Sequence, residues 1–147
     1  MIYPLIYAYL ATIGFSYIFN APKKAIFLIG FIGTLGWLSY SGIVILNDSK
    51  ILGSFIGAFV VTTSSELSAR RFKMPATIFL IPGIIPLVPG SGLYYTMLLF
   101  IQKNDASAIR VGTETVFIAG AIAIAIATSA SFFKKRNDKN IKSNLKL

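Results

Sequence analysis

The stretch Ile81-Pro82-Gly83-Ile84-Ile85-Pro86-Leu87-Val88-Pro89-Gly90-Ser91-Gly92 decides how this chain folds. It is apolar, yet proline removes a backbone N–H and clashes with the preceding helical turn, and it pushes the residue before it toward extended geometry. We therefore expect non-helical backbone at Pro82, Pro86 and Pro89. Long apolar runs flank the stretch, and irregular backbone at membrane depth persists only where protein buries it or a cavity solvates it. The pattern predicts a break that binds a polar ligand; the alternative is a structural kink filled by neighbouring helices.

The composition indicates an integral membrane protein. Of the 147 residues, 55% are hydrophobic and 13% are charged, whereas soluble domains carry about 25% charged residues. The length allows about four to six spans of roughly 20 residues each. The net charge of +9 suits orientation and contact with anionic membrane lipid. Nucleic acid is not expected as a partner, because no basic stretch is interleaved with aromatic residues.

The residue types exclude several kinds of chemistry. The sequence has no cysteine and no histidine, which excludes disulfides, Cys/His metal sites and a Ser-His-Asp triad. No nucleophile–base pair is visible, so we expect neither an enzyme nor a bound metal or cofactor. The N-terminus lacks the basic region and cleavage site of a signal peptide and is interpreted as a retained span.

The apolar runs predict an all-α integral membrane protein with about five transmembrane helices. The fourth is broken by the Pro/Gly-rich stretch, which is either unwound or re-entrant. With an extended middle, residues 75–101 exceed a ~30 Å hydrocarbon core, so this stretch is expected to fold back partly. Residues 102–110 form the longest expected loop. The predicted spans are residues 2–19, 25–46, 51–69, 75–101 and 111–133, which make a transmembrane domain of residues 1–133 followed by a basic cytoplasmic tail of residues 134–147.

Basic residues predict the orientation. With five spans, eleven of the fourteen Lys/Arg residues fall on one side of the membrane and three on the other. The positive-inside rule then places the N-terminus outside and the C-terminus in the cytoplasm.

Small residues predict close helix contacts. Gly53 and Gly57 form a GxxxG pair, which lets helix backbones approach each other in lipid. Self-association into a homo-oligomer is left open. Trp37 and Tyr40 lie mid-span, where they either line a cavity or pack in the core.

Two acids near the membrane core are candidates for proton coupling, Glu66 and Glu114, because intramembrane acids are functional by default. Each also has a structural interpretation. Glu66 precedes Arg70 by four residues, the favourable order for a helical ion pair. Glu114 falls in the first turn of the last predicted span, where a carboxylate complements the helix dipole.

The break itself suggests how a substrate is bound. Ser91 is expected to cap the second half-helix, and the free N–H groups at that terminus attract a carboxylate. Freed carbonyls at the end of the first half attract an ammonium group or a cation, so a zwitterionic amino acid or a carboxylate fits both ends. Thr62 lies on a polar face of the third span. The predicted substrate-binding residues are Pro82, Gly83, Pro86, Pro89, Gly90, Ser91, Tyr94, Tyr95 and Thr62.

Several runs of residues resemble one known family. They are Phe19-Asn20-Ala21-Pro22-Lys23-Lys24-Ala25, Gly36-Trp37, Ser65-Glu66-Leu67-Ser68-Ala69-Arg70-Arg71, the run from Met74 to Met97, Thr113-Glu114-Thr115 and Gly120-Ala121-Ile122-Ala123. The chain resembles the small membrane-only component, the YjjB-like half, of the threonine/serine exporter family. The resemblance covers nearly all of the chain except the basic tail.

The resemblance implies an inner-membrane exporter of small amino acids or carboxylates that works with a larger YjjP-like partner subunit. It implies no settled catalytic residues. The sequence thus predicts a subunit of a secondary exporter. The alternative is a membrane scaffold subunit that stabilises a partner without transporting anything itself.

Overall fold

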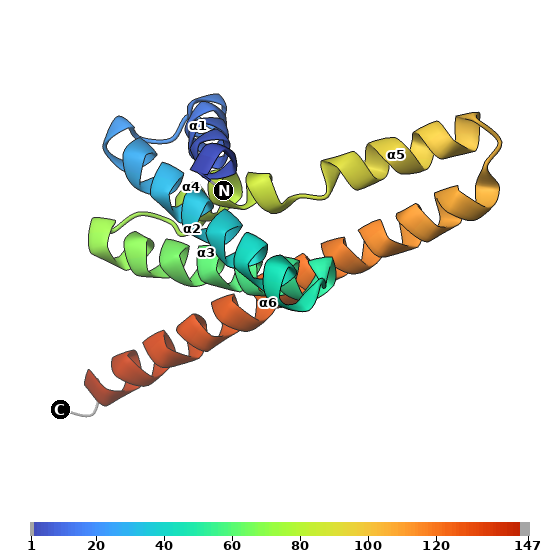
Figure 1. Ribbon diagram of the computed structural model, residues 1–147. Coiled ribbons are helices and arrows are strands. Elements are labelled where there is room, and N and C mark those ends of the chain that lie inside the picture. Colours follow the sequence, from blue (N-terminus) through green and yellow to red (C-terminus); the bar gives the residue numbers. More distant parts are fainter. Residues whose placement is uncertain (1, 145–147) are drawn as a thin grey trace.

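The computed structural model describes the backbone of residues 2–144 and the side chains of residues 3–133. Its elements are α1 (Ile2–Ile18), α2 (Lys23–Asn47), α3 (Lys50–Phe72), α4 (Thr77–Ile84), the 3₁₀ helix η1 (Ile85–Leu87), α5 (Gly90–Ile101) and α6 (Asp105–Asn144). The described chain is therefore all-helical. The helices α1 to α4 form a packed body, and α5 with the first part of α6 extends from it as a hairpin (Figure 1).

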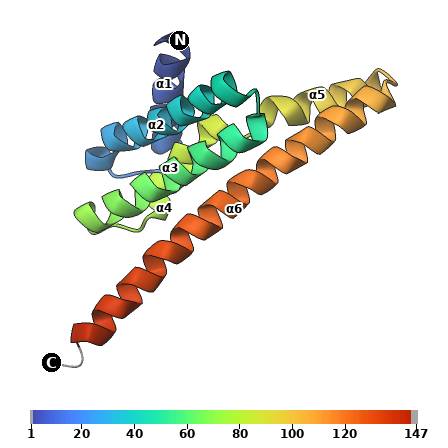
Figure 2. The same ribbon diagram turned by 60° about the horizontal axis from the view of Figure 1, so that its bottom comes forward.

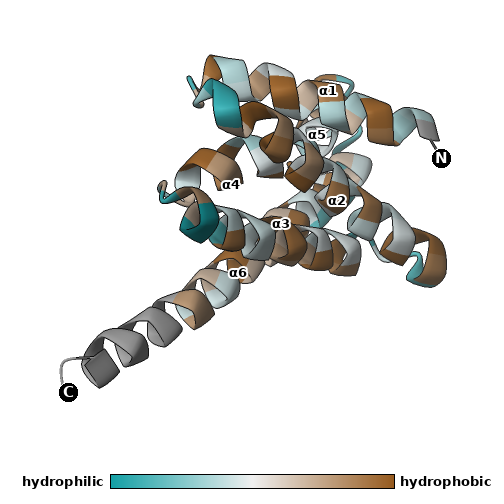
Figure 3. Cartoon of the chain, turned by 90° about the vertical axis from the view of Figure 1, so that its left-hand side faces the viewer, coloured by the Kyte–Doolittle hydropathy of each residue, from teal (hydrophilic) through white to brown (hydrophobic). Residues whose placement is uncertain are grey.

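The helices have the length and the surface of a membrane protein. Within the described residues, α2, α3 and the Asp105–Phe133 part of α6 are long and apolar enough to cross a membrane, and the pair α4–η1 and α5 makes a fourth if it is one span. The helix α1 is shorter, at 17 residues. Apolar residues cover the helix bodies, while the hydrophilic residues gather at turns (Figure 3). An all-helical architecture with three to four candidate membrane spans is confirmed, and the count of five spans with a broken fourth stays a prediction.

Close helix approach holds α2 against α3. A Cβ atom at Gly57 would lie 2.9 Å from the carbonyl oxygen of Gly36, and one at Gly53 would lie 3.0 Å from the carbonyl oxygen of Tyr40. Only glycine leaves room for these backbone contacts, which matter in lipid because packing drives helix association there. The predicted role of the GxxxG pair as a helix contact is confirmed.

The expectation of non-helical backbone at all three prolines was wrong for two of them. Pro82 lies inside α4 and Pro86 inside η1, and the regular backbone is interrupted only at Val88 and Pro89. Pro82 and the neighbouring Gly83 are buried, and a Cβ at Gly83 would lie 3.3 Å from both Ile32 and Val61. Packing against α2 and α3 therefore outweighs the one backbone hydrogen bond that Pro82 cannot donate.

The segment from α4 to α5 bends between its two halves. Because helix persists almost throughout, residues 77–101 rise by only about 1.5 Å each, and the two halves meet at a bend of 46°. The extended middle from which the fold-back was expected is limited to Val88 and Pro89, and the bend fits either a broken span or a re-entrant loop, so that part of the expectation stays a prediction. The expected loop over residues 102–110 is also shorter than predicted, because α6 begins at Asp105.

The helices α3 and α6 run in the same direction (Figure 2). Since α4, η1 and α5 connect the end of α3 to the start of α6, this segment carries the chain back past the start of α3: α4 and η1 pack against α3, whereas α5 packs against α6. Three interhelix contacts fix the register: Lys50 with Glu114, Thr63 with Ser129, and Arg70 with Phe133. Residues 105–113 of α6 therefore extend beyond the start of α3, accompanied there by α5.

The helix α6 continues to Asn144, past the predicted domain boundary at residue 133. The side chains of the predicted tail, and residues 145–147 altogether, lie outside the described residues. The domain boundary and the tail stay predictions.

Candidate functional site

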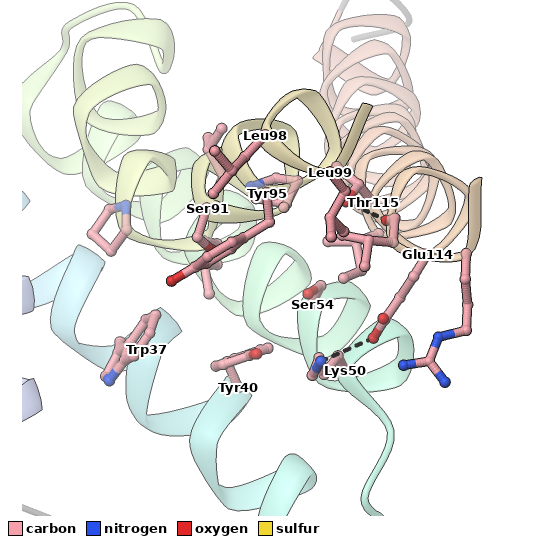
Figure 4. Close-up of a pocket in the computed structure, with 18 of the residues that line it drawn as sticks. Trp37, Tyr40, Lys50, Ser54, Ser91, Tyr95, Leu98, Leu99, Glu114 and Thr115 are labelled. Atoms are coloured by element: carbon pink, nitrogen blue, oxygen red, sulfur yellow. Dashed lines mark hydrogen bonds and ion pairs between the residues drawn. The ribbon is translucent and has the colours of Figure 1, made fainter. Parts of the chain in front are cut away.

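A cavity of about 740 Å³ lies where α5 leaves the helical body. Its wall comes from α2, the start of α3, η1, the break, most of the length of α5 and the second to fourth turns of α6. Figure 4 shows side chains from these separate elements converging on one space. The cavity thus occupies the angle between the two halves of the broken segment.

The break supplies polar backbone to this cavity. Val88 is extended (φ −64°, ψ 128°) and Pro89 precedes α5 with φ −77° and ψ 56°. The N–H groups of Ser91 and Gly92 lie in the first turn of α5, where a helix has no internal acceptors, and both residues line the cavity. The expected cap by Ser91 was wrong: Pro89 occupies the N-cap position and no side chain caps this terminus. Helix begins one residue before Ser91, which leaves its hydroxyl inside the first turn.

Opposite charges meet on the cavity wall. The Lys50 Nζ lies 3.1 Å from the Glu114 Oε1, and the side chains are 56% and 42% exposed. Arg110, one turn earlier on α6, lines the same cavity. Glu114 does not lie in a first turn as expected, because α6 begins at Asp105 and so places Glu114 in its third turn. It pairs with a lysine instead of complementing a helix dipole.

Aromatic side chains also line this cavity. The rings of Trp37 and Tyr40 lie 5.2 Å apart on α2, and Tyr95 reaches the cavity from α5. The two alternatives for Trp37 and Tyr40 both hold, because each residue lines the cavity and also packs, partly buried, against the hydrophobic core. Tyr94 lies outside the cavity, 63% exposed, with its ring edge against Tyr95.

The structure brings together about half of the residues expected to bind substrate. Pro86, Pro89, Ser91 and Tyr95 line the cavity together with Glu114. Pro82 and Gly83 are buried in the packing of α4, and Gly90 lies outside the lining residues.

Thr62 is also buried, at 1% exposure, and does not reach the cavity. Its hydroxyl donates to the Ala58 carbonyl oxygen at 2.8 Å. This back-bond satisfies the hydroxyl within its own helix.

Glu66 lies at the other end of α3, in a second cavity of about 410 Å³ that Arg70 and Lys73 also line. No ion pair joins Glu66 to Arg70, although both side chains are described. Arg70 instead donates from Nη2 to the Phe133 carbonyl oxygen at 3.0 Å, and its guanidinium lies 4.9 Å from the centre of the Phe133 ring. The two candidate acids thus belong to separate cavities at opposite ends of α3.

Sequence reasoning missed the cations of the cavity, since it assigned Lys50 and Arg110 to loops. One signal was available for Lys50. It follows Ser49, which caps α3 by accepting from the Leu52 N–H. A cation in the first turn faces the positive end of the helix dipole, which is unfavourable without a nearby anion.

These features define the chain as an all-helical protein with three to four candidate membrane spans and a charged cavity at the bend between α4–η1 and α5, which fits a multi-pass membrane protein of the transport class. The chain belongs to the threonine/serine exporter family, ThrE, whose model matches residues 4–132. The resemblance seen in the sequence is thereby confirmed.

One curated relative is an uncharacterized protein of Haemophilus influenzae (strain ATCC 51907 / DSM 11121 / KW20 / Rd). It is 24% identical over 144 residues, which cover 92% of this chain and 48% of the relative. The chain therefore spans about half the length of this relative. No solved structure matches the chain.

Proposed function

We propose that this chain is one subunit of a secondary exporter of threonine, serine or a related small carboxylate, and that the cavity at the break holds the substrate. The observation that carries the proposal is the charged cavity of about 740 Å³, which opens beside free N–H groups of α5. Membership of the threonine/serine exporter family supports the substrate class.

The proposed membrane topology has five crossings. The parallel course of α3 and α6 supports α4, η1 and α5 as one bent crossing between them, and α1 is the first crossing. An odd number of crossings puts the termini on opposite sides. The distribution of Lys and Arg then places the N-terminus outside and the C-terminus in the cytoplasm of an inner-membrane protein.

The proposed exporter needs a larger partner subunit. Support comes from the relative, of which this chain matches only 48%. Glu66 and Glu114 are the proposed proton-coupling residues, one in each cavity.

Reconstitution into vesicles tests the proposal. The chain is incorporated with its partner, and the partner is also incorporated alone; flux of labelled threonine and of labelled succinate is then measured. We expect flux of at least one substrate only with both chains. Equal flux by the partner alone would instead identify this chain as a scaffold.

A pair of matched variants addresses the cavity directly. Ser91→Phe fills the cavity and should abolish flux, whereas Leu93→Phe on the same turn of α5 lies outside the lining residues, where Leu93 is 59% exposed, and should transport normally. Normal flux by Ser91→Phe would move the substrate site elsewhere.

A further inference from the structure

The ion pair between Lys50 and Glu114 bridges two helices across one edge of the cavity. Lys50 is the first residue of α3, and Glu114 lies in the third turn of α6. Both side chains are about half exposed. A pair as exposed as this contributes no more than about 1 kcal/mol to stability, so a ligand can separate the two charges at little cost.

Each partner of the pair can also be satisfied by a ligand of opposite charge. Lys50 stands at the positive end of the α3 dipole, which makes an anion beside it favourable whether that anion is Glu114 or a ligand carboxylate. Arg110 adds a second cation to the same wall. Glu114 is the acid among the residues that line this cavity, and it can accept from an ammonium group.

We propose that the Lys50–Glu114 pair is the element that recognises a zwitterion, which inserts between the two side chains. The ligand's carboxylate binds Lys50 and Arg110, and its ammonium group binds Glu114. The inserted ligand replaces one ion pair by three contacts, so each of the three charged side chains has a partner of opposite charge. This inference rests on the proposed function, because it assigns the substrate contacts within the proposed site.

The charges of the wall also predict what is rejected. A dicarboxylate offers nothing to Glu114 and repels it, and an amine without a carboxylate meets the cations Lys50 and Arg110. Such repulsive elements produce selectivity in the same way as attractive ones. A carboxylate and an ammonium group must therefore both be present for tight binding.

Fluorescence of Trp37 provides the assay. It is the one tryptophan of the chain and it lines the cavity, so its emission reports on occupancy without interference from another indole. The purified chain of 147 residues in lipid nanodiscs is titrated with L-threonine, with 3-hydroxybutyrate, which lacks the ammonium group, and with 1-amino-2-propanol, which lacks the carboxylate.

We expect threonine to bind at least about tenfold more tightly than either analogue, a discrimination typical of charge pairs in binding sites. In Glu114→Gln, threonine affinity should fall by about tenfold or more, while 3-hydroxybutyrate should bind at least as tightly as it does to the unaltered chain. Lys50→Met should weaken both ligands, and Lys50→Arg should restore both. The matched control is Asp105→Asn, which removes an acid of α6 outside the cavity and should change neither affinity.

The outcomes separate the two proposals. Threonine binding that is unchanged in Glu114→Gln and Lys50→Met overturns the inference and leaves the cavity as the proposed site. An equal loss of both ligands in Glu114→Gln also overturns it, because an acid that binds ammonium should not matter for 3-hydroxybutyrate. A chain whose Trp37 emission responds to none of the three ligands contradicts the proposed substrate site itself, and the inference with it.

Discussion

Replacing Gly57 by alanine should loosen the contact between α2 and α3 that positions the break. The added methyl group would lie 2.9 Å from the Gly36 carbonyl oxygen and 3.2 Å from both terminal methyl groups of Leu87. Ordinary van der Waals contact begins near 3.4 Å, so the backbone of α2 must retreat by about half an ångström. Since Leu87 ends η1 and lines the cavity, the same movement reaches the site.

The magnitude follows from two opposing effects. Alanine is favoured over glycine inside a helix by up to about 1 kcal/mol, and overpacking a close contact costs about 1–3 kcal/mol. Gly42→Ala is the matched control, because a Cβ at Gly42 meets no atom within 4 Å and only the favourable effect remains. We therefore expect Gly57→Ala to be less stable than Gly42→Ala by about 1–3 kcal/mol.

The assay is unfolding in mixed micelles with increasing dodecyl sulfate, followed by circular dichroism. Threonine affinity is measured on the same samples from Trp37 emission and should fall in Gly57→Ala alone. Equal stability of Gly57→Ala and Gly42→Ala would refute the reasoning, because it would mean that the α2–α3 contact yields without cost.

Three further outcomes are expected. Phe79 is fully buried and Phe117 is 60% exposed, so Phe79→Ala should lower the free energy of unfolding by about 3–5 kcal/mol, and Phe117→Ala should lower it far less; similar losses would contradict the described core. Glu66→Gln should abolish pH-driven export in reconstituted vesicles while threonine binding measured from Trp37 emission stays unchanged, because Glu66 lies in the other cavity; normal export would remove Glu66 from proton coupling. In a chain without native cysteine, a cysteine at Asn104 should be labelled from outside intact cells and one at Ser143 should not, and the reverse pattern would overturn the topology.

The sequence predicted most helices well, because the length of an apolar run and the spacing of small residues are properties of a single segment. The run from Lys50 to Phe72 is long, apolar and capped by Ser49, and the structure makes it one helix. The Gly53 and Gly57 spacing likewise indicated a close helix contact, which the structure contains. These predictions needed no knowledge of which helix lies next to which.

The prolines show where local reasoning failed. Proline has a cost within a helix that the sequence reveals, but the compensation at Pro82 comes from burial of α4 against α2 and α3. That compensation is tertiary, so the sequence overstated the length of the break. Within residues 77–101, only Val88 and Pro89 depart from helical backbone. The site therefore lies at the angle between two helices.

The charged wall of the cavity depends on register, which no single segment encodes. Lys50 and Glu114 are 64 positions apart in the chain, and they meet because α3 and α6 run parallel with their starts displaced. Each residue of the pair has a feature that its own segment reveals. Lys50 stands at the unfavourable end of a helix dipole, and Glu114 lies in an apolar helix. Each of these features is costly alone and neutral when the two are paired. An unfavourably placed cation on one predicted span and an acid on another would therefore together have suggested this pair. Intramembrane acids considered singly give Glu66 and Glu114 equal standing.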